Sequence, residues 1–180
     1  MTPHEPTIES RRIYKGRFLG LRVDTVQLSR GGVSQREVVE HGASVAIVPL
    51  DSQNNVLLVR QYRKAVEQML LEVPAGGLDE GEGPEECARR ELQEETGYTA
   101  SRMEHLASFF MSPGYCTEEM HAFLATGLNT GQPRPEADED IEVVAVPLDC
   151  ILGMIQVGEI KDAKSIAALF LTLERTRVVS

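Results

Sequence analysis

The sequence predicts an α/β protein in which a mixed β-sheet is sandwiched between helices. Two apolar runs, at residues 43–50 and 56–62, flank the polar turn 51–55 and are typical of paired, buried strands. Further strand-like segments lie at 69–73, 105–111, 120–125 and 141–147. Because helical segments are mixed with these strands, we expect helices on both faces of the sheet, an α/β/α arrangement.

The helical segments have recognisable ends. One helix is expected to begin at Pro84, because proline suits the first helical position, and to end before Gly97. Two more are expected at 148–157 and after Asp162, which can cap a helix. The apolar stripe predicted to face the core in the last helix is Ile166, Leu169, Phe170 and Leu173.

The N-terminal part predicts an antiparallel β-hairpin. Residues 16–28 and 35–40 read as strands, and the turn 29–32 between them contains Gly-Gly. Residues 1–10 are expected to be a loose start. A lone hairpin is marginal in water, so this one must pack on another surface.

The net charge excludes some partners. The 180 residues carry a formal charge of −10, which argues against nucleic acid and against an anionic membrane surface, since both attract clustered Lys and Arg. Eight acids and two arginines in 79–95 sum to −6, and five acids in 136–142 sum to −5. The rest of the chain is therefore nearly neutral, and the acidity is concentrated in two clusters.

Compartment and cysteine chemistry follow from simple counts. No apolar run reaches the ~18 residues of a membrane span, and no signal peptide is visible at the N-terminus. The three cysteines form no CxxC pair, which disfavours a disulfide framework or a structural zinc site. We therefore expect a cytoplasmic protein.

The first acidic cluster places carboxylates on an apolar helix stripe. Ala88, Glu91, Leu92 and Glu95 share one face, with Glu94 beside it, whereas Arg90 is expected to point nearly the other way. Two carboxylates one turn apart repel each other and are costly to desolvate, and bound cations would resolve both problems. Oxygen ligands favour Mg²⁺ or Mn²⁺. The alternative is an exposed helix with solvated glutamates.

The wider spacing resembles a known signature. From Gly76 the chain reads G-x5-E-x7-R-E-L-x-E-E-x-G-Y, which resembles the box of the Nudix hydrolases, enzymes that cleave nucleoside diphosphates linked to another group. Tyr98 stands where an aliphatic residue is usual. The resemblance implies a Nudix fold and metal ligation by Glu91, Glu94, Glu95 and the Ala75 carbonyl. It also implies structural roles for Gly76, Glu82, Arg90 and Gly97.

Features outside the box resemble the ADP-ribose pyrophosphatase subfamily. Pro113 follows Gly97 by 16 residues, within Ser-Pro-Gly, and the stretches 59–63 and 71–76 are also similar. The acidic loop before residues 141–143 is a further likeness. The resemblance implies that a loop glutamate acts as general base or orients the attacking water. Glu139 matches best, and Glu136 is the alternative, with Asp138 between them.

The subfamily resemblance also implies substrate contacts and a dimer. Arg36, Glu37, Arg63, Pro113 and Gly114 match positions that contact substrate. Phe18, with Tyr14 second, is the candidate for stacking on adenine, although Phe18 could equally be ordinary hairpin packing. Residues 1–40 would form an extension exchanged between the protomers of a homodimer, and residues 41–180 the hydrolase domain. Arg36, Glu37 and Phe18 would then reach the partner's site.

The resulting expectation is hydrolysis of ADP-ribose to AMP and ribose 5-phosphate, with Mg²⁺ as cofactor and Mn²⁺ as the alternative. The alternatives are a Nudix hydrolase acting on another nucleotide sugar or a dinucleotide (GDP-mannose, ADP-glucose or NADH) and a non-catalytic module that senses ADP-ribose. A third is an acidic metal-buffering protein. All box glutamates are present, which disfavours the sensing module.

Overall fold

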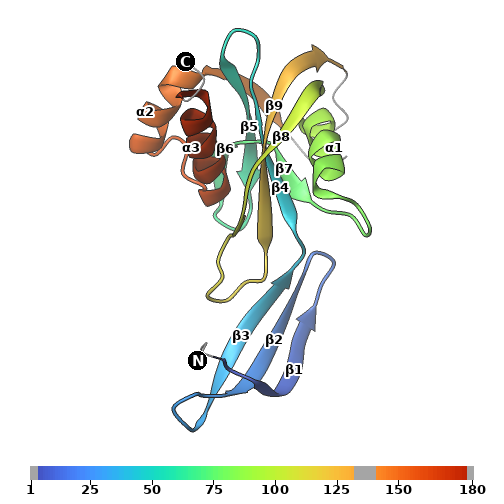
Figure 1. Cartoon of the computed structure of the whole chain (residues 1–180), viewed down its shortest axis with the longest axis vertical. Helices are drawn as coiled ribbons and strands as arrows, with labels where there is room; N and C mark the ends of the chain where they lie inside the picture. Colours follow the sequence, from blue (N-terminus) through green and yellow to red (C-terminus); the bar gives the residue numbers. More distant parts are fainter. Residues whose placement is uncertain (1–3, 132–140, 178–180) are drawn as a thin grey trace. The chain divides into compact units, whose positions relative to one another are not determined.

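The computed structural model describes residues 4–131 and 141–177, which form two compact units. The first unit contains the N-terminal residues up to Ala43 together with Phe110–Glu119. The second contains the rest of the described chain. Each unit is presented by itself below, and Figure 1 gives the element labels.

The first unit is an antiparallel sheet of three strands in the order β1-β2-β3. Its strands are β1 (Thr7–Lys15), β2 (Leu19–Gln27) and β3 (Val33–His41). The predicted hairpin is confirmed, and Gly31 and Gly32 both have positive φ in its turn. The expectation that residues 1–10 are a loose start is wrong for Thr7–Ser10, because these residues belong to β1, which pairs with β2.

This sheet exposes an unusual amount of its surface. Every residue of β1 is exposed, and one face carries a polar chain in which Ser10 and Arg22 bond Asp24 while Arg22 also bonds Glu40. The exposed large apolar side chains on its strands and turns are Ile8, Ile13, Tyr14, Phe18, Leu19 and Val33. Apolar side chains in this number are the kind of surface that proteins normally cover.

The second unit contains two further sheets. A mixed four-stranded sheet has the order β7-β4-β9-β8, in which β4 (Ser44–Pro49) pairs parallel with β9 (Glu119–Thr130). A three-stranded antiparallel sheet has the order β10-β5-β6. The remaining strands are β5 (Asn55–Arg63), β6 (Gln68–Glu72), β7 (Ala75–Gly77), β8 (Tyr98–Phe110) and β10 (Glu142–Pro147). Every residue of β4 is buried, as its apolar run predicts.

Helices lie on both sides of β4, so the α/β/α prediction is confirmed. Helix α1 (Pro84–Thr96) packs on one side and α3 (Ala163–Arg177) on the other, with the short α2 (Ile151–Gln156) near α3 (Figure 1). The core beneath α1 consists of Val45, Ile47, Cys87, Ala88, Leu92, Ala100, Phe123 and Ala125. None of the helices in the described chain is long and apolar enough to cross a membrane.

The predicted helix ends are confirmed, but one predicted helix face is not. Pro84 is the first residue of α1, and Gly97 ends it with a left-handed φ of 74°. Asp162 caps α3 by accepting the Ser165 N–H at 3.1 Å. In α3, however, Phe170 is 42% exposed, and the side turned inward is formed by Ser165, Ala168, Leu169 and Thr172.

Candidate active site

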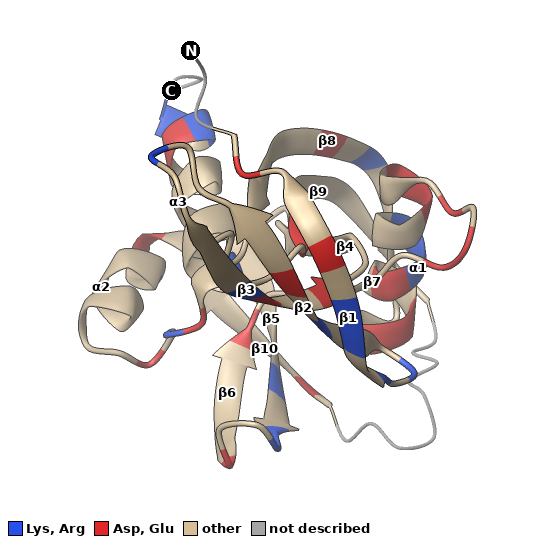
Figure 2. Cartoon of the chain, turned by 90° about the horizontal axis from the view of Figure 1, so that it is seen from below, with Lys and Arg blue, Asp and Glu red and all other residues tan. Residues whose placement is uncertain are grey.

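Helix α1 turns part of its acidic surface inward. Ala88 and Leu92 are fully buried against the sheet, and Glu95, on the same face, is only 5% exposed. Acidic residues also gather on the loop that leads into α1 (Figure 2). Burying the apolar stripe therefore brings Glu95 to the inside of the fold, as the helical periodicity predicts.

Glu91 lies directly against the backbone of β7. A side chain at Gly76 would place its first carbon 2.0 Å from Glu91 Oε1, far inside van der Waals contact. The Glu91 side chain is only 13% exposed. Glycine at position 76 thus leaves the space that the Glu91 carboxylate occupies.

Arg90 connects three glutamates. Its Nε and Nη2 donate to Glu82 at 2.9 Å each, and its Nη1 donates to Glu91 at 2.7 Å and Glu94 at 2.9 Å. Helical geometry alone predicts that Arg90 points away from the stripe, which is wrong because its long side chain folds back toward the glutamates; these bonds agree with the structural role that the resemblance implies. The bond from Arg90 lowers the pKa of Glu82 to about 2. Its bonds to the glutamates raise the pKa of Arg90, so the Arg90–Glu82 pair stays ionised.

Glu95 is held by the chain segment just before the box glycine. Its Oε2 accepts the Ala75 N–H at 3.2 Å. Ala75 is also the residue whose carbonyl the resemblance assigns to a metal. The structure therefore places Glu95, Ala75 and the neighbouring Gly76–Glu91 contact at one end of β7.

The donor set in this region fits a hard divalent cation. Glu91, Glu94 and Glu95 offer only carboxylate oxygens, which suit a hard ion, and burial raises the pKa of the nearby Cys87 thiol to about 12. Among the described residues, no three His, Cys, Asp or Glu side chains already converge on one point. Arg90 draws Glu91 and Glu94 to itself, so metal ligation by these residues remains a prediction.

Arg63 belongs to an ion-pair network on the second unit. Its Nε and Nη2 donate to the two oxygens of Glu72 at 2.9 and 2.7 Å, and Lys164 also pairs with Glu72 and with Asp162. Burial alone would raise the pKa of Glu72, which is 1% exposed, but its bonds to Arg63 and Lys164 outweigh burial and lower it. The charge of Glu95 also acts on Arg63, which brings this arginine into the electrostatic field of the box.

Sequence reasoning missed the partners of Arg63. Glu72 lies in the stretch 71–76 that resembles the subfamily, but the sequence assigns this residue no function. Lys164 comes 92 residues later in the chain. A pairing at that separation has no local sequence signal.

The other predicted substrate contacts lie in the first unit. Arg36 pairs with Glu5, using Nε and Nη2 at 2.9 and 2.7 Å. Glu37 follows on the same strand and so faces the other side of the sheet. Phe18 is 72% exposed and carries the Arg17 guanidinium 4.8 Å from its ring centre. Because its ring is exposed, Phe18 is accessible to a ligand, and its stacking on adenine stays a prediction.

Pro113 and Gly114 lie on a loop that is fastened to the edge of β3. The Val39 N–H donates to the Tyr115 carbonyl at 2.7 Å, and the Thr117 N–H donates to the Val39 carbonyl at 3.0 Å. A side chain at Gly114 would meet nothing within 4 Å, so the loop does not need glycine there for space. The loop and the strand that carries Arg36 and Glu37 are thus one hydrogen-bonded piece.

The proposed catalytic base falls outside the described residues. Glu136, Asp138 and Glu139 all belong to the segment 132–140. Their role therefore rests on the sequence alone.

Comparison with known families identifies the class of protein. The NUDIX domain family matches residues 40–169, and the chain therefore belongs to the Nudix hydrolases, whose members depend on a divalent metal ion. The N-terminal domain of nucleoside diphosphate sugar hydrolases matches residues 5–39. The chain is accordingly a Nudix pyrophosphohydrolase of the nucleoside diphosphate sugar type.

Individual relatives carry more than one name. The chain is 40% identical over 167 residues to an ADP-ribose pyrophosphatase of Bacillus subtilis (strain 168), a match that covers 92% of this chain and 90% of the relative. The same identity and coverage relate it to a methanol dehydrogenase activator of Bacillus methanolicus. It is 36% identical to a GDP-mannose pyrophosphatase of Citrobacter koseri, over 91% of this chain and 92% of the relative.

A solved structure supports the fold. The crystal structure of an ADP compounds hydrolase matches with a TM-score of 0.89, covering 98% of this chain and 96% of that one. Its sequence identity is 24%, so this likeness concerns the fold alone. The Nudix fold expected from the box is thereby confirmed.

Proposed function

We propose that the protein hydrolyses ADP-ribose to AMP and ribose 5-phosphate, with Mg²⁺ as the preferred cofactor and Mn²⁺ as the alternative. The observation that carries this proposal is the acidic end of β7, where Glu91 and Glu95 lie against Gly76 and Ala75. The relative named ADP-ribose pyrophosphatase, at 40% identity, supports the choice of substrate. GDP-mannose is the second candidate because a relative of that name is 36% identical.

Four groups would hold the metal: the carboxylates of Glu91, Glu94 and Glu95 and the carbonyl of Ala75. When bound, a divalent ion neutralises the diphosphate and lowers the pKa of a coordinated water. Arg90 would release Glu91 and Glu94 in part while keeping its two bonds to Glu82. The pairing of Arg90 with Glu82 would then still fasten the loop before α1 to the helix.

The chain's own residues would orient the substrate and move a proton. Arg63 binds oxygens of the diphosphate with its free edge, since Glu72 occupies its Nε and Nη2. Glu139, or Glu136, accepts the proton of the attacking water. The water oxygen bonds to one phosphorus, the bridging P–O bond breaks, and the second phosphate leaves with the bridging oxygen.

We further propose a homodimer in which residues 1–40 are exchanged and Arg36, Glu37 and Phe18 complete the partner's site, with Pro113 and Gly114 beside them. The exposed apolar side chains of the three-stranded sheet support this proposal, because a second chain would cover them. Residues 41–180 would be the hydrolase domain. A cytoplasmic location is also proposed, from three cysteines that are all free thiols.

The direct test is release of AMP from ADP-ribose with and without Mg²⁺. We expect AMP only when the metal is present, and faster turnover of ADP-ribose than of GDP-mannose, ADP-glucose or NADH. Tight binding of ADP-ribose without AMP release would instead identify a sensing module. Metal binding with no hydrolysis of any of the four compounds would identify a metal buffer.

Replacing Glu95 tests the assignment of the site. Glu95→Gln should lower kcat/KM by more than about tenfold at millimolar Mg²⁺, because an amide oxygen is a weak ligand for a hard ion. Glu85→Gln is the matched control, since Glu85 lies in the exposed first turn and pairs with Arg89. Full activity of Glu95→Gln would remove Glu95 from the metal site.

A further inference from the structure

The second unit contains a cavity that the proposed reaction does not use. Its volume is about 770 Å³, within the range of ligand pockets. The β4–β5 turn, strands β8 and β9, and the last turn of α3 provide its walls. None of its lining residues belongs to the box segment 76–98, and none is Arg63 or Ala75. Whatever binds there is therefore separate from the acidic end of β7.

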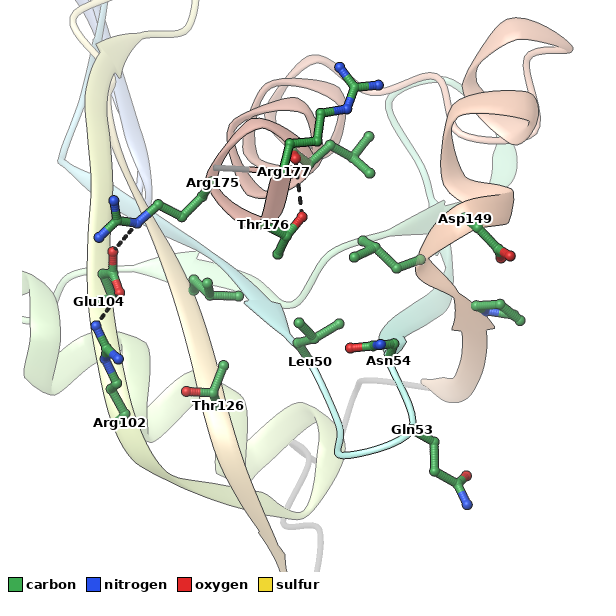
Figure 3. A pocket seen from close by; sticks show the side chains of 14 residues that line it. Leu50, Gln53, Asn54, Arg102, Glu104, Thr126, Asp149, Arg175, Thr176 and Arg177 are labelled. Atoms are coloured by element: carbon green, nitrogen blue, oxygen red, sulfur yellow. Dashed lines mark hydrogen bonds and ion pairs between the residues drawn. The ribbon is translucent and has the colours of Figure 1, made fainter. Parts of the chain in front are cut away.

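The floor of this cavity is apolar. Leu50 and Leu124 are 9% and 6% exposed, and Leu148 and Leu173 also line the cavity. Asn54 and the hydroxyl-bearing Thr126 lie among them (Figure 3). A surface of this kind accommodates a hydrocarbon or an aromatic ring rather than a hydrated ion.

One wall of the cavity is basic and is built from two distant elements. Arg102 of β8 donates to Glu104 Oε2 at 2.7 Å, and Arg175 of α3 donates to Glu104 Oε1 at 2.6 Å. Each guanidinium gives one nitrogen to Glu104, and a guanidinium has five N–H donors, so both arginines have further N–H groups that can face a ligand. The wall carries a net charge of +1 in a chain of net charge −10.

The helix dipole does not explain this wall. Arg175 lies in the last turn of α3, where a cation complements the dipole. Arg102, however, lies on a strand, where no helix dipole acts. Glu104 is 71 residues from Arg175 in the sequence, yet it binds both arginines and holds them on the same side of the cavity (Figure 3). Arg177 also lines the cavity, but it pairs with Glu174 and its guanidinium points away from the cavity in Figure 3.

We propose that this cavity binds a small organic anion, with an apolar body on the leucine floor and a carboxylate, phosphate or sulfonate on the Arg102–Glu104–Arg175 wall. Arginine forks suit oxyanions of this kind. The apolar floor adds a requirement that inorganic phosphate does not meet. The site would act as a second ligand site of the enzyme, independent of the diphosphate site.

The test uses 8-anilino-1-naphthalenesulfonate, an organic anion with an apolar body, on the full-length protein. Amide shifts in ¹⁵N–¹H spectra should concentrate in residues 50–54, 102–104 and 173–177. Arg102→Gln and Arg175→Gln should each weaken binding at least about fivefold, because each removes a charged hydrogen bond. Arg177→Gln is the matched control from the same helix turn and should change the affinity less than about twofold.

Two further arms decide between this site and others. The uncharged N-phenyl-1-naphthylamine should bind at least about tenfold more weakly, since it lacks the oxyanion. Glu95→Gln should bind the anion as the wild type does, whether or not the proposed hydrolysis is correct. Largest shifts in residues 8–19, equal binding of the neutral analogue, or unchanged affinity in both Arg102→Gln and Arg175→Gln would each overturn the proposal.

Discussion

At Gly76 the backbone of β7 and the Glu91 carboxylate share a space that no other residue would leave open. A first side-chain carbon there would lie 2.0 Å from Glu91 Oε1 and 2.1 Å from its carboxyl carbon. Gly76→Ala should therefore displace Glu91 and lower kcat at saturating substrate by at least about tenfold, an effect expected for a misplaced metal ligand. Steady-state kinetics over a range of Mg²⁺ concentrations would measure it.

The neighbouring glycine provides the control for this prediction. A side chain at Gly77 would meet nothing within 4 Å, so Gly77→Ala should keep near wild-type activity and the same melting temperature. Equal activity of both alanine variants would mean that Glu91 does not need its position against β7. Equal loss in both would point to a general effect on the strand.

The pairing of Glu82 with Arg90 predicts a dependence of stability on pH. The folded pKa of Glu82 is about 2, below its ordinary value of 4.5. A lowered carboxyl pKa stabilises the fold above the unfolded pKa, and this stabilisation is lost as pH falls from about 4.5 to about 2. Since Arg90 is partly exposed, we expect a contribution of roughly 1–2 kcal/mol at pH 7.

Urea unfolding of Glu82→Gln at several pH values would check this contribution. The variant should be less stable than the wild type at pH 7, and the two free energies of unfolding should converge only as the pH falls to about 2. Glu85→Gln, in the exposed first turn, should follow the wild-type curve. A constant gap between Glu82→Gln and the wild type at every pH would contradict the assigned pKa.

The sequence predicted the positions of the individual glutamates better than it predicted their hydrogen-bond partners. Helical periodicity was enough to place Glu95 on the inward face, because the repeat of 3.6 residues fixes which side chains share a side. It failed for Arg90, whose long side chain reaches over a turn to Glu82 and Glu94. The Arg63–Glu72 pair joins two strands whose register places Glu72 opposite Val59, so the contact depends on the reach of the long Arg63 side chain.

At the scale of elements, the sequence predicted correctly those helix boundaries that depend on residues at the boundary itself. Pro84 and Gly97 mark both ends of α1, as predicted. Strand β1 was missed because all nine of its residues are exposed, so no apolar alternation marks it. Its extended form comes from backbone pairing with β2, which a hydrophobic pattern does not encode.

The corrected face of α3 can be tested with two neighbouring residues. Leu169 is fully buried, whereas Phe170 is 42% exposed. Leu169→Ala should lower the free energy of unfolding by about 2–4 kcal/mol, the usual cost of a cavity in a packed core. Phe170→Ser should change it by less than about 1 kcal/mol. Denaturant titration of both variants would contradict the observed face if the larger loss came from Phe170→Ser.

At the scale of the whole molecule, the charge of −10 separates into local arrangements. In the box segment, Arg90 already pairs with four of the acids, Asp79, Glu82, Glu91 and Glu94, so part of the acidity is compensated locally. The basic wall with Arg102 and Arg175 lies on another part of the second unit. Net charge alone therefore describes neither of the two proposed ligand sites.

The proposed exchange of residues 1–40 predicts complementation between two defective chains. Arg36→Ala and Glu95→Gln should each be strongly impaired as homodimers. In a purified heterodimer of the two, one site would combine both defects and the other would have neither. We therefore expect about half of the wild-type activity per dimer, because a two-fold dimer has two equivalent sites. Differently tagged, co-expressed chains would provide this heterodimer for AMP-release assays.

The reciprocal heterodimer makes the prediction decisive. Here one chain carries both Arg36→Ala and Glu95→Gln, and its partner is wild type. If Arg36 serves the partner's site, each site receives one defect and the heterodimer is inactive. If Arg36 instead serves the site of its own chain, this heterodimer keeps one intact site and about half of the activity. The first heterodimer would then be inactive, because each of its sites would carry one defect. Light scattering on both samples, against the 19.9 kDa mass of a single chain, would establish that the assayed species are dimers.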